Sequence, residues 1–128
     1  MTSGAHSSEY ILVVEDDRDV RESLCEALIL EGYSVVCAEN GRAALAHLMA
    51  NVPPCIILLD LMMPVMDGWT FRSEMLKSPA LASLPVIVMT AASAARAAVA
   101  AAKAILYKPL DMGTVVGTVQ EYCPHGTA

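Results

Sequence analysis

Polar side chains that could do chemistry stand directly after apolar runs at several points in this chain. Glu15 and Asp16 follow the first run, Asp60 follows a second, and Thr90 and Lys108 follow two later ones. Carboxylates, a hydroxyl and an ammonium group together can hold a cation and neutralise the oxygens of a phosphoryl group. This set of residue types indicates phosphate chemistry, with Asp60 as the group around which the others gather.

The acidic part of this set requires a positive partner. Carboxylates within about 5 Å of one another repel by roughly 3 kcal/mol per pair at an effective dielectric near 20. Hard oxygen ligands on a partly open site suit Mg²⁺, or Mn²⁺ in its place. A carboxylate is also an accepted nucleophile in phosphoryl transfer. Asp60 is therefore predicted to act beside a divalent cation.

The elements that must position these side chains follow from the apolar pattern. Residues 55–59 are uniformly apolar and too few for a helix, which is typical of a fully buried central strand ending at Asp60. We expect strands over residues 10–14, 33–38, 55–59, 86–89 and 105–107, and helices over residues 18–31, 43–49, 69–77, 91–104 and 111–122. Alternation at this spacing predicts an α/β fold, a doubly wound five-stranded parallel sheet with helices on both faces. The carboxyl ends of its strands then meet at one edge.

Length and composition set the class of protein. A chain of 128 residues with 55% hydrophobic residues predicts one domain, over residues 10–122, with a flexible tail at 1–9 and a second tail at 123–128. A formal net charge of −6 argues against a nucleic-acid partner. Neither a membrane span nor a signal peptide is found in the sequence, so we expect a cytoplasmic protein that does not bind membranes.

The four cysteines are expected to be reduced thiols. Cys25, Cys37, Cys55 and Cys123 have no CxxC spacing, and three of them lie in apolar segments. Buried thiols are the more common state for such cysteines than disulfides or zinc ligands.

Four motifs in order connect the chain to a family. They are Val13-Val14-Glu15-Asp16, the stretch from Leu58 to Gly68 (LLDLMMPVMDG), Val88-Met89-Thr90-Ala91 and Lys108-Pro109. This set resembles the receiver domain of two-component response regulators over about residues 10–122, either of the stand-alone type or excised from a longer chain. The resemblance implies a flavodoxin-like sheet of order 2-1-3-4-5, an order that is the known one for such domains rather than worked out from this sequence.

The resemblance also implies roles for single residues. Asp60 would accept a phosphoryl group from a phosphohistidine on a sensor histidine kinase or a histidine phosphotransfer protein, and the domain would then act on a downstream protein target. The metal ligands would be Glu15, Asp16, Asp60 and the backbone carbonyl of Met62, with Asp16 binding directly. Thr90 and Lys108 would contact the phosphoryl oxygens, and the Lys108-Pro109 peptide would be cis. Such a protein is not an enzyme, because it catalyses only its own phosphorylation and slow dephosphorylation.

The chain departs from the family's pattern in the region between Thr90 and Lys108. Ile105 occupies the position where the family usually has a Tyr or Phe, and the interval is shorter than usual. The fourth helix is therefore expected to be truncated or displaced, and the output to differ. Met62 and Ala92 offer no polar group to orient water, so self-hydrolysis is expected to be slow.

Two other functions remain open at this level. The same departures are compatible with a degenerate receiver that acts as a phosphorylation-independent interaction module. A haloacid-dehalogenase-like phosphatase also uses an Asp nucleophile and Mg²⁺ after a buried strand, but it needs a second Asp where this chain has Met62.

Overall fold

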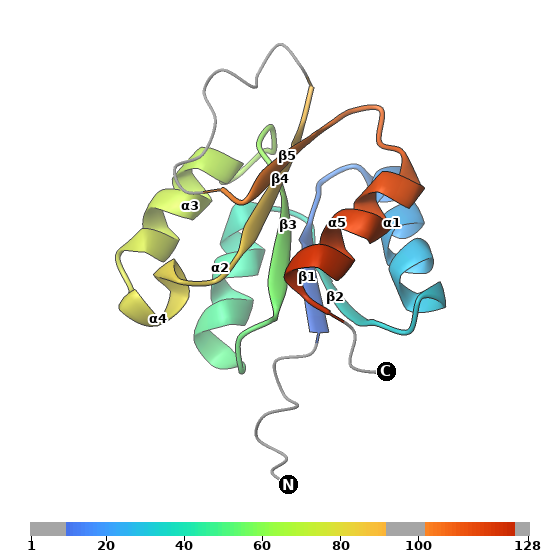
Figure 1. The fold of residues 1–128 in the computed structure, drawn as a ribbon. Coiled ribbons are helices and arrows are strands. Elements are labelled where there is room, and N and C mark those ends of the chain that lie inside the picture. Colours follow the sequence, from blue (N-terminus) through green and yellow to red (C-terminus); the bar gives the residue numbers. More distant parts are fainter. Residues whose placement is uncertain (1–9, 92–101, 125–128) are drawn as a thin grey trace, which may run out of the picture.

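Five parallel strands form one sheet in the computed structural model, which describes residues 10–91 and 102–124 (Figure 1). The strands are β1 (Tyr10–Val14), β2 (Ser34–Ala38), β3 (Ile56–Asp60), β4 (Val86–Thr90) and β5 (Ala104–Tyr107). Their order is β2-β1-β3-β4-β5, and every neighbouring pair is parallel. The predicted order is confirmed.

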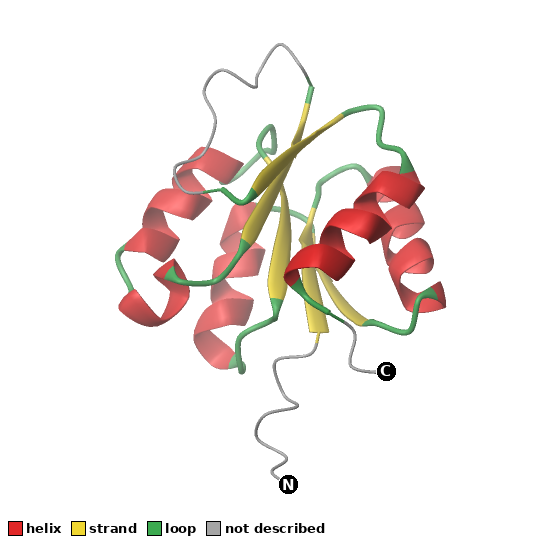
Figure 2. Cartoon of the chain, in the orientation of Figure 1, coloured by secondary structure: helices red, strands yellow, loops and turns green. Residues whose placement is uncertain are grey.

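Helices cover both faces of this sheet. They are α1 (Arg18–Leu30), α2 (Gly41–Ala50), α3 (Gly68–Leu76), α4 (Pro79–Ala82) and α5 (Met112–Tyr122). Figures 1 and 2 show α1 and α5 on one face and α2, α3 and α4 on the other. The predicted doubly wound α/β architecture is confirmed.

Two apolar cores lie between the helices and the sheet. Side chains alternate along each strand, so Leu12 and Val14 of β1 point into one core while Ile11 and Val13 point into the other. All residues of β3 and β4 are buried, which is typical of central strands covered on both faces. Asp60, at the carboxyl end of β3, is therefore positioned by a strand that is packed on both faces.

Three acidic residues begin helices. Asp17, Asp67 and Asp111 each accept a hydrogen bond from the backbone amide three residues on, at 3.1, 2.8 and 3.0 Å. A carboxylate there satisfies a free amide and interacts favourably with the helix dipole. Asp17, Asp67 and Asp111 therefore cap α1, α3 and α5.

Two details differ from expectation. The connection after Ser78, expected to lack secondary structure, contains the short helix α4, which begins at Pro79. Proline is favoured at the first helical position because its missing N–H has no partner to lose there. The helix expected at 91–104 falls mostly on residues 92–101, outside the described residues, and Ala104 already belongs to β5.

The prediction of reduced cysteines is wrong in this structure. Cys25 is bonded to Cys37, and Cys55 is bonded to Cys123. The fold packs α1 beside β2 and brings the end of α5 to the start of β3, contacts that cysteine spacing does not reveal. The Cα atoms of Cys55 and Cys123 lie 5.8 Å apart, within the usual span of a disulfide, whereas those of Cys25 and Cys37 lie 7.7 Å apart.

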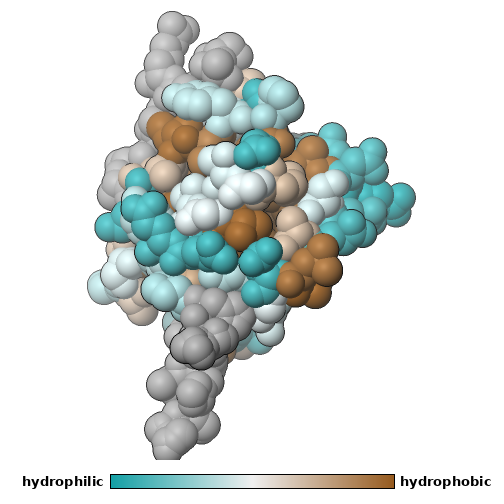
Figure 3. Space-filling model, turned by 45° about the vertical axis from the view of Figure 1, so that its right-hand side comes forward, coloured by the Kyte–Doolittle hydropathy of each residue, from teal (hydrophilic) through white to brown (hydrophobic). Residues whose placement is uncertain are grey.

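The surface over α1 and α5 is mixed in character. Figure 3 shows apolar atoms there in separate groups among polar ones. On α1 the exposed apolar residues are Ile29 and Leu30. Within residues 10–91 and 102–124, no helix has both the length and the apolar character needed to cross a membrane.

Candidate functional site

The polar residues singled out from the sequence meet at the carboxyl edge of the sheet. Glu15 follows β1, Asp60 and Thr90 end β3 and β4, and Lys108 follows β5. Glu15, Asp60 and Thr90 are almost completely buried, with exposed fractions of 0%, 3% and 1%. Buried polar groups at a strand end require partners, and here they are one another's neighbours.

Lys108 is the positive centre of this group. Its Nζ lies 2.9 Å from Oε1 of Glu15 and 3.4 Å from Oδ1 of Asp60. The contact between Lys108 Nζ and Glu15 Oε1 is an ion pair whose geometry does not meet the criteria for a hydrogen bond. The backbone amide of Lys108 donates to the Thr90 carbonyl at 2.9 Å, and the Lys108-Pro109 peptide is cis, as predicted. The lysine is thus held at both its backbone and its ammonium group.

These contacts shift two pKa values. Burial and the neighbouring Glu15 carboxylate raise the pKa of Asp60 to about 7, although Lys108 opposes them. Burial works to lower the pKa of Lys108, but Glu15 and Asp60 outweigh it, so that pKa lies above its ordinary value. Without a further cation, Asp60 is therefore partly protonated near neutral pH while Lys108 stays charged.

Three carboxylates are close enough to share one cation. Glu15, Asp16 and Asp60 each offer an oxygen, and these oxygens lie within 4.8 Å of one another. Asp16 is exposed, so the group is open to solvent on one side. All-oxygen ligands on a partly open site fit Mg²⁺, which keeps several waters and takes one or two carboxylates. The residues present fit the predicted metal.

The hydroxyl of Thr90 differs from the Glu15 carboxylate in having neither a hydrogen-bond partner nor an ion-pair partner among the described residues. Its Oγ1 is buried and has no hydrogen-bond partner among the described residues. A buried hydroxyl without a partner costs roughly 1–3 kcal/mol. It is therefore placed to donate to an oxygen that a ligand brings in.

Met62 lies at the mouth of the site. Its backbone amide approaches Oδ1 of Asp60 at 3.4 Å, and its side chain is 60% exposed. An apolar side chain there gives water no polar anchor beside the acceptor. The role of its carbonyl as a metal ligand stays a prediction.

Arg21 supports the site but was not singled out from the sequence. Its Nη1 donates to the backbone carbonyls of Glu15 and Asp16, at 2.9 and 3.3 Å. These bonds tie the turn after β1 to α1. An arginine inside an amphipathic helix gives no sequence signal of such a contact, because it is typical of any solvated helix face.

The loop after Asp60 is shaped by close backbone contacts. A Cβ atom on Gly68 would lie 2.5 Å from the Asp60 carbonyl oxygen, and the Gly68 amide donates to Leu61 at 2.9 Å. Only glycine allows this approach. Val65, in the same loop, has a φ of 68°, a left-handed conformation that is costly for a β-branched residue.

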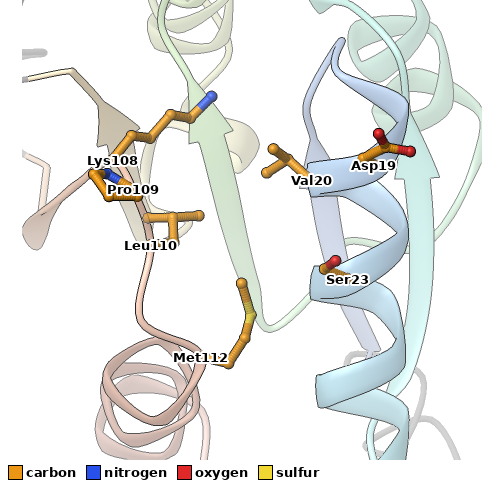
Figure 4. Close-up of a pocket in the computed structure, with 7 residues that line it drawn as sticks. All are labelled: Asp19, Val20, Ser23, Lys108, Pro109, Leu110 and Met112. Atoms are coloured by element: carbon orange, nitrogen blue, oxygen red, sulfur yellow. The ribbon is translucent and has the colours of Figure 1, made fainter.

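A groove of about 270 Å³ opens beside Lys108, between α1 and the segment that leads into α5 (Figure 4). It is lined by Asp19, Val20, Ser23, Lys108, Pro109, Leu110 and Met112. Figure 4 shows the Lys108 ammonium directed toward the carboxyl end of β3 and away from Ser23 and Met112. The lysine thus serves the acidic edge, and the groove beside it is lined mainly by apolar side chains.

Ile105 lies beside the site in β5. It is half-buried, packs against the core on the α2–α3 side and pairs in register with Val88. Tyr107, 51% exposed, pairs in register with Thr90. The aromatic residue of this strand thus stands two positions after Ile105.

Comparison with known proteins adds an independent finding. The family model described as the response regulator receiver domain matches residues 11–120. The chain belongs to this receiver-domain family. Glu15, Asp60, Thr90 and Lys108, which end or directly follow four of its strands, therefore lie at the acidic edge of a receiver domain. The family implies that this edge carries a phosphoacceptor.

Several proteins are similar to this receiver domain. The regulatory protein AtoC of Escherichia coli is 40% identical over 106 residues, 80% of this chain and 22% of AtoC. The response regulator MprA of Mycolicibacterium vanbaalenii is 46% identical over 81 residues, 63% of this chain and 34% of MprA. An uncharacterized 14.6 kDa protein of Leptolyngbya boryana is 35% identical over 88% of both chains. The chain thus spans a fifth to a third of the first two relatives.

A solved structure shows the same fold. The response regulator TrrA from Thermotoga maritima, in complex with Mg²⁺-BeF, superposes with a TM-score of 0.78 at 30% identity, covering 89% of this chain and 98% of that one.

Proposed function

We propose that this receiver domain takes a phosphoryl group onto Asp60 from a phosphohistidine, in the presence of Mg²⁺ or Mn²⁺. The observation that carries the proposal is the joint placement of Asp60 with a lysine ammonium 3.4 Å away and an unpartnered buried Thr90 hydroxyl. The similar TrrA protein, solved with Mg²⁺-BeF, supports the metal. The donor is a sensor histidine kinase or a histidine phosphotransfer protein.

The chemistry is a direct transfer between two nucleophiles. A carboxylate oxygen of Asp60 forms a bond to phosphorus as the bond from phosphorus to the histidine nitrogen breaks, and that nitrogen keeps the electron pair. Lys108 neutralises charge on the phosphoryl oxygens, and Thr90 donates a hydrogen bond to one of them. Glu15, Asp16 and Asp60 would hold the divalent cation, which would supply further neutralisation and favour the ionised form of Asp60.

The biological role follows from this chemistry. We infer a signalling protein rather than an enzyme, because membership of the receiver-domain family makes the acyl phosphate itself the expected signal. Its partners are the phosphohistidine donor and a downstream protein target, and its compartment is the cytoplasm. The exposed Met62 side chain leaves water unoriented at the acceptor, so the acyl phosphate should hydrolyse slowly.

Acetyl phosphate tests the acceptor. The full chain is incubated with acetyl phosphate and Mg²⁺, and the intact protein is weighed. We expect a gain of one phosphoryl group that disappears in Asp60→Asn and persists in Asp67→Asn, a matched change at a helix cap. A gain of one phosphoryl group that persists in Asp60→Asn would show that another residue is the acceptor. No gain in the wild type would favour the phosphorylation-independent interaction module.

A further inference from the structure

The end of the sheet opposite the acidic edge carries a second chemical feature. Cys55 immediately precedes β3, Cys123 immediately follows α5, and their sulfurs are bonded. Figure 1 shows the last turn of α5 at the end of the sheet where β1 and β3 begin. Nothing in the receiver chemistry uses these two residues.

The backbone at this pair is already placed for a disulfide. The Cα separation of 5.8 Å lies in the usual range, so the bond can open and close without moving β3 or α5 apart. Two further contacts fix the geometry. The Cys55 amide donates to the Tyr10 carbonyl at 2.9 Å, and the Tyr33 hydroxyl donates to the Cys123 carbonyl at 2.8 Å.

The two cysteine residues differ in exposure to solvent. Cys123 is 6% exposed, whereas Cys55 is only half-buried. A partly exposed cysteine can be attacked by, or can attack, a sulfur from solution, and exposed disulfides are the more easily exchanged ones. Cys55 is thus the entry point and Cys123 the resolving partner.

We propose that Cys55 and Cys123 form a redox-responsive thiol–disulfide pair that exchanges with glutathione-type disulfides and thiols. In the closing direction, the Cys55 thiolate attacks oxidised glutathione and releases one glutathione thiolate. The Cys123 thiolate then attacks the mixed disulfide and releases the second. The two protein thiols lose two electrons and two protons in total, and oxidised glutathione becomes two reduced glutathiones.

The consequence of the bond concerns the half of the domain that carries the acceptor. The bridge spans 68 residues, and the closed loop contains Asp60, Thr90 and Lys108. It attaches the last turn of α5 directly to the start of the acceptor strand. Oxidation therefore fixes α5 on the sheet, and reduction leaves it held by Val115 and Val119 and by the Tyr33 hydrogen bond.

Thiol mapping tests the pair. The full chain is equilibrated with an excess of either oxidised or reduced glutathione, free thiols are alkylated, and peptides are weighed. We expect Cys55 and Cys123 to be joined and protected in oxidised glutathione and both alkylated in reduced glutathione. The melting temperature should fall by roughly 5–10 °C on reduction.

The melting temperature is also compared in the variant Cys25→Ser/Cys37→Ser, which lacks the other disulfide and should keep the redox response of Cys55 and Cys123. In that background Cys55→Ser should abolish the redox shift in melting temperature, and if it does not fold, the peptide map of the wild type still decides. The proposal is overturned if Cys55 and Cys123 stay separately alkylated in oxidised glutathione. It is equally overturned if their bond resists excess reduced glutathione. Because no phosphoryl donor is used, the result is independent of Asp60.

Discussion

Asp60, the proposed phosphoryl acceptor, is also a source of instability. It is buried beside Glu15, and the pKa of its carboxyl is raised to about 7. A raised acidic pKa means that the folded state favours the protonated form. The carboxyl of Asp60 contributes its full share to the free energy of unfolding below pH 4, the pKa of an unfolded aspartate, where it is protonated in both states. That contribution is lost as the pH rises through about 7, the pKa of Asp60 in the folded protein.

Replacement of Asp60 by Asn should therefore stabilise the metal-free protein. Above pH 7 the gain in free energy of unfolding should be on the order of 2 kcal/mol, because the amide carries no charge to bury. At pH 4 the gain should vanish. Urea denaturation in EDTA, at pH 4 and above pH 7, measures this gain in the free energy of unfolding. Asp67→Asn is the control. Equal gains at both pH values would contradict the assigned charge burial.

Val65 offers a second test at a single residue. Its left-handed φ of 68° should be relieved by Val65→Gly, with a gain of about 1 kcal/mol in the free energy of unfolding. Val65→Ala removes the β-branch but keeps a Cβ, so it should gain less. Chemical denaturation of the three proteins checks the order, and a loss of stability in Val65→Gly would refute it.

The residues of the site were largely predictable from the sequence. Asp60, Thr90 and Lys108 could be found because each is a polar residue directly after an apolar run, and parallel strands bring such positions together. Arg21 could not be found, because its contacts are to backbone carbonyls of a turn. The unsatisfied state of the Thr90 hydroxyl also depends on packing that no local pattern encodes.

At the scale of elements, two helical glycines lie in contrasting surroundings. Gly68 begins α3 against the Asp60 carbonyl, where an added Cβ would lie 2.5 Å away. Gly117 lies inside α5 with no atom within 4 Å of an added Cβ. The first glycine is required by space, and the second only weakens its helix.

Alanine at these two positions should therefore act in opposite directions. Gly68→Ala should lower the free energy of unfolding by about 2–3 kcal/mol, because backbone must shift at the acceptor loop. Gly117→Ala should raise it by about 0.5–1 kcal/mol through helix propensity. Thermal and urea denaturation of both variants measure the two changes in the free energy of unfolding. Two changes of the same sign would contradict the assigned environments.

The strands were predictable where the sequence has a clear apolar run between turn residues. The strands around Ile57 and Val88 are short uniform apolar runs, and the sheet places them at its centre. The short helix α4 was missed because four residues are too few to show a helical period. The cysteine pairs were missed because each joins segments that only the tertiary fold brings together.

For the whole molecule, binding of a divalent cation should appear as added stability. Mg²⁺ at about 100 times its Kd adds about 2.7 kcal/mol to a protein that binds it only when folded. The rise in melting temperature should be larger at pH 8 than at pH 6, because a proton competes for Asp60, whose pKa is about 7.

Matched variants identify the ligands in this measurement. Asp16→Asn should lose most of the Mg²⁺-dependent rise, whereas Asp19→Asn, an exposed change in the first turn of α1, should keep it. A thermal shift titration with Mg²⁺ at both pH values gives the answer. An equal rise in the two variants would remove Asp16 from the metal site.

The start of β1 and the end of α5 are neighbours, joined through Cys55, whose amide bonds to Tyr10 and whose sulfur bonds to Cys123. Both ends of the folded unit thus leave it at the side away from the acidic edge (Figure 1). A folded unit whose two ends lie close together can be inserted into a surface loop of another protein without distorting that protein. It can also be circularly permuted, with new ends placed in one of its own loops. For engineering, such an insertion would leave the acidic edge, with Asp60, on the side facing away from the host protein.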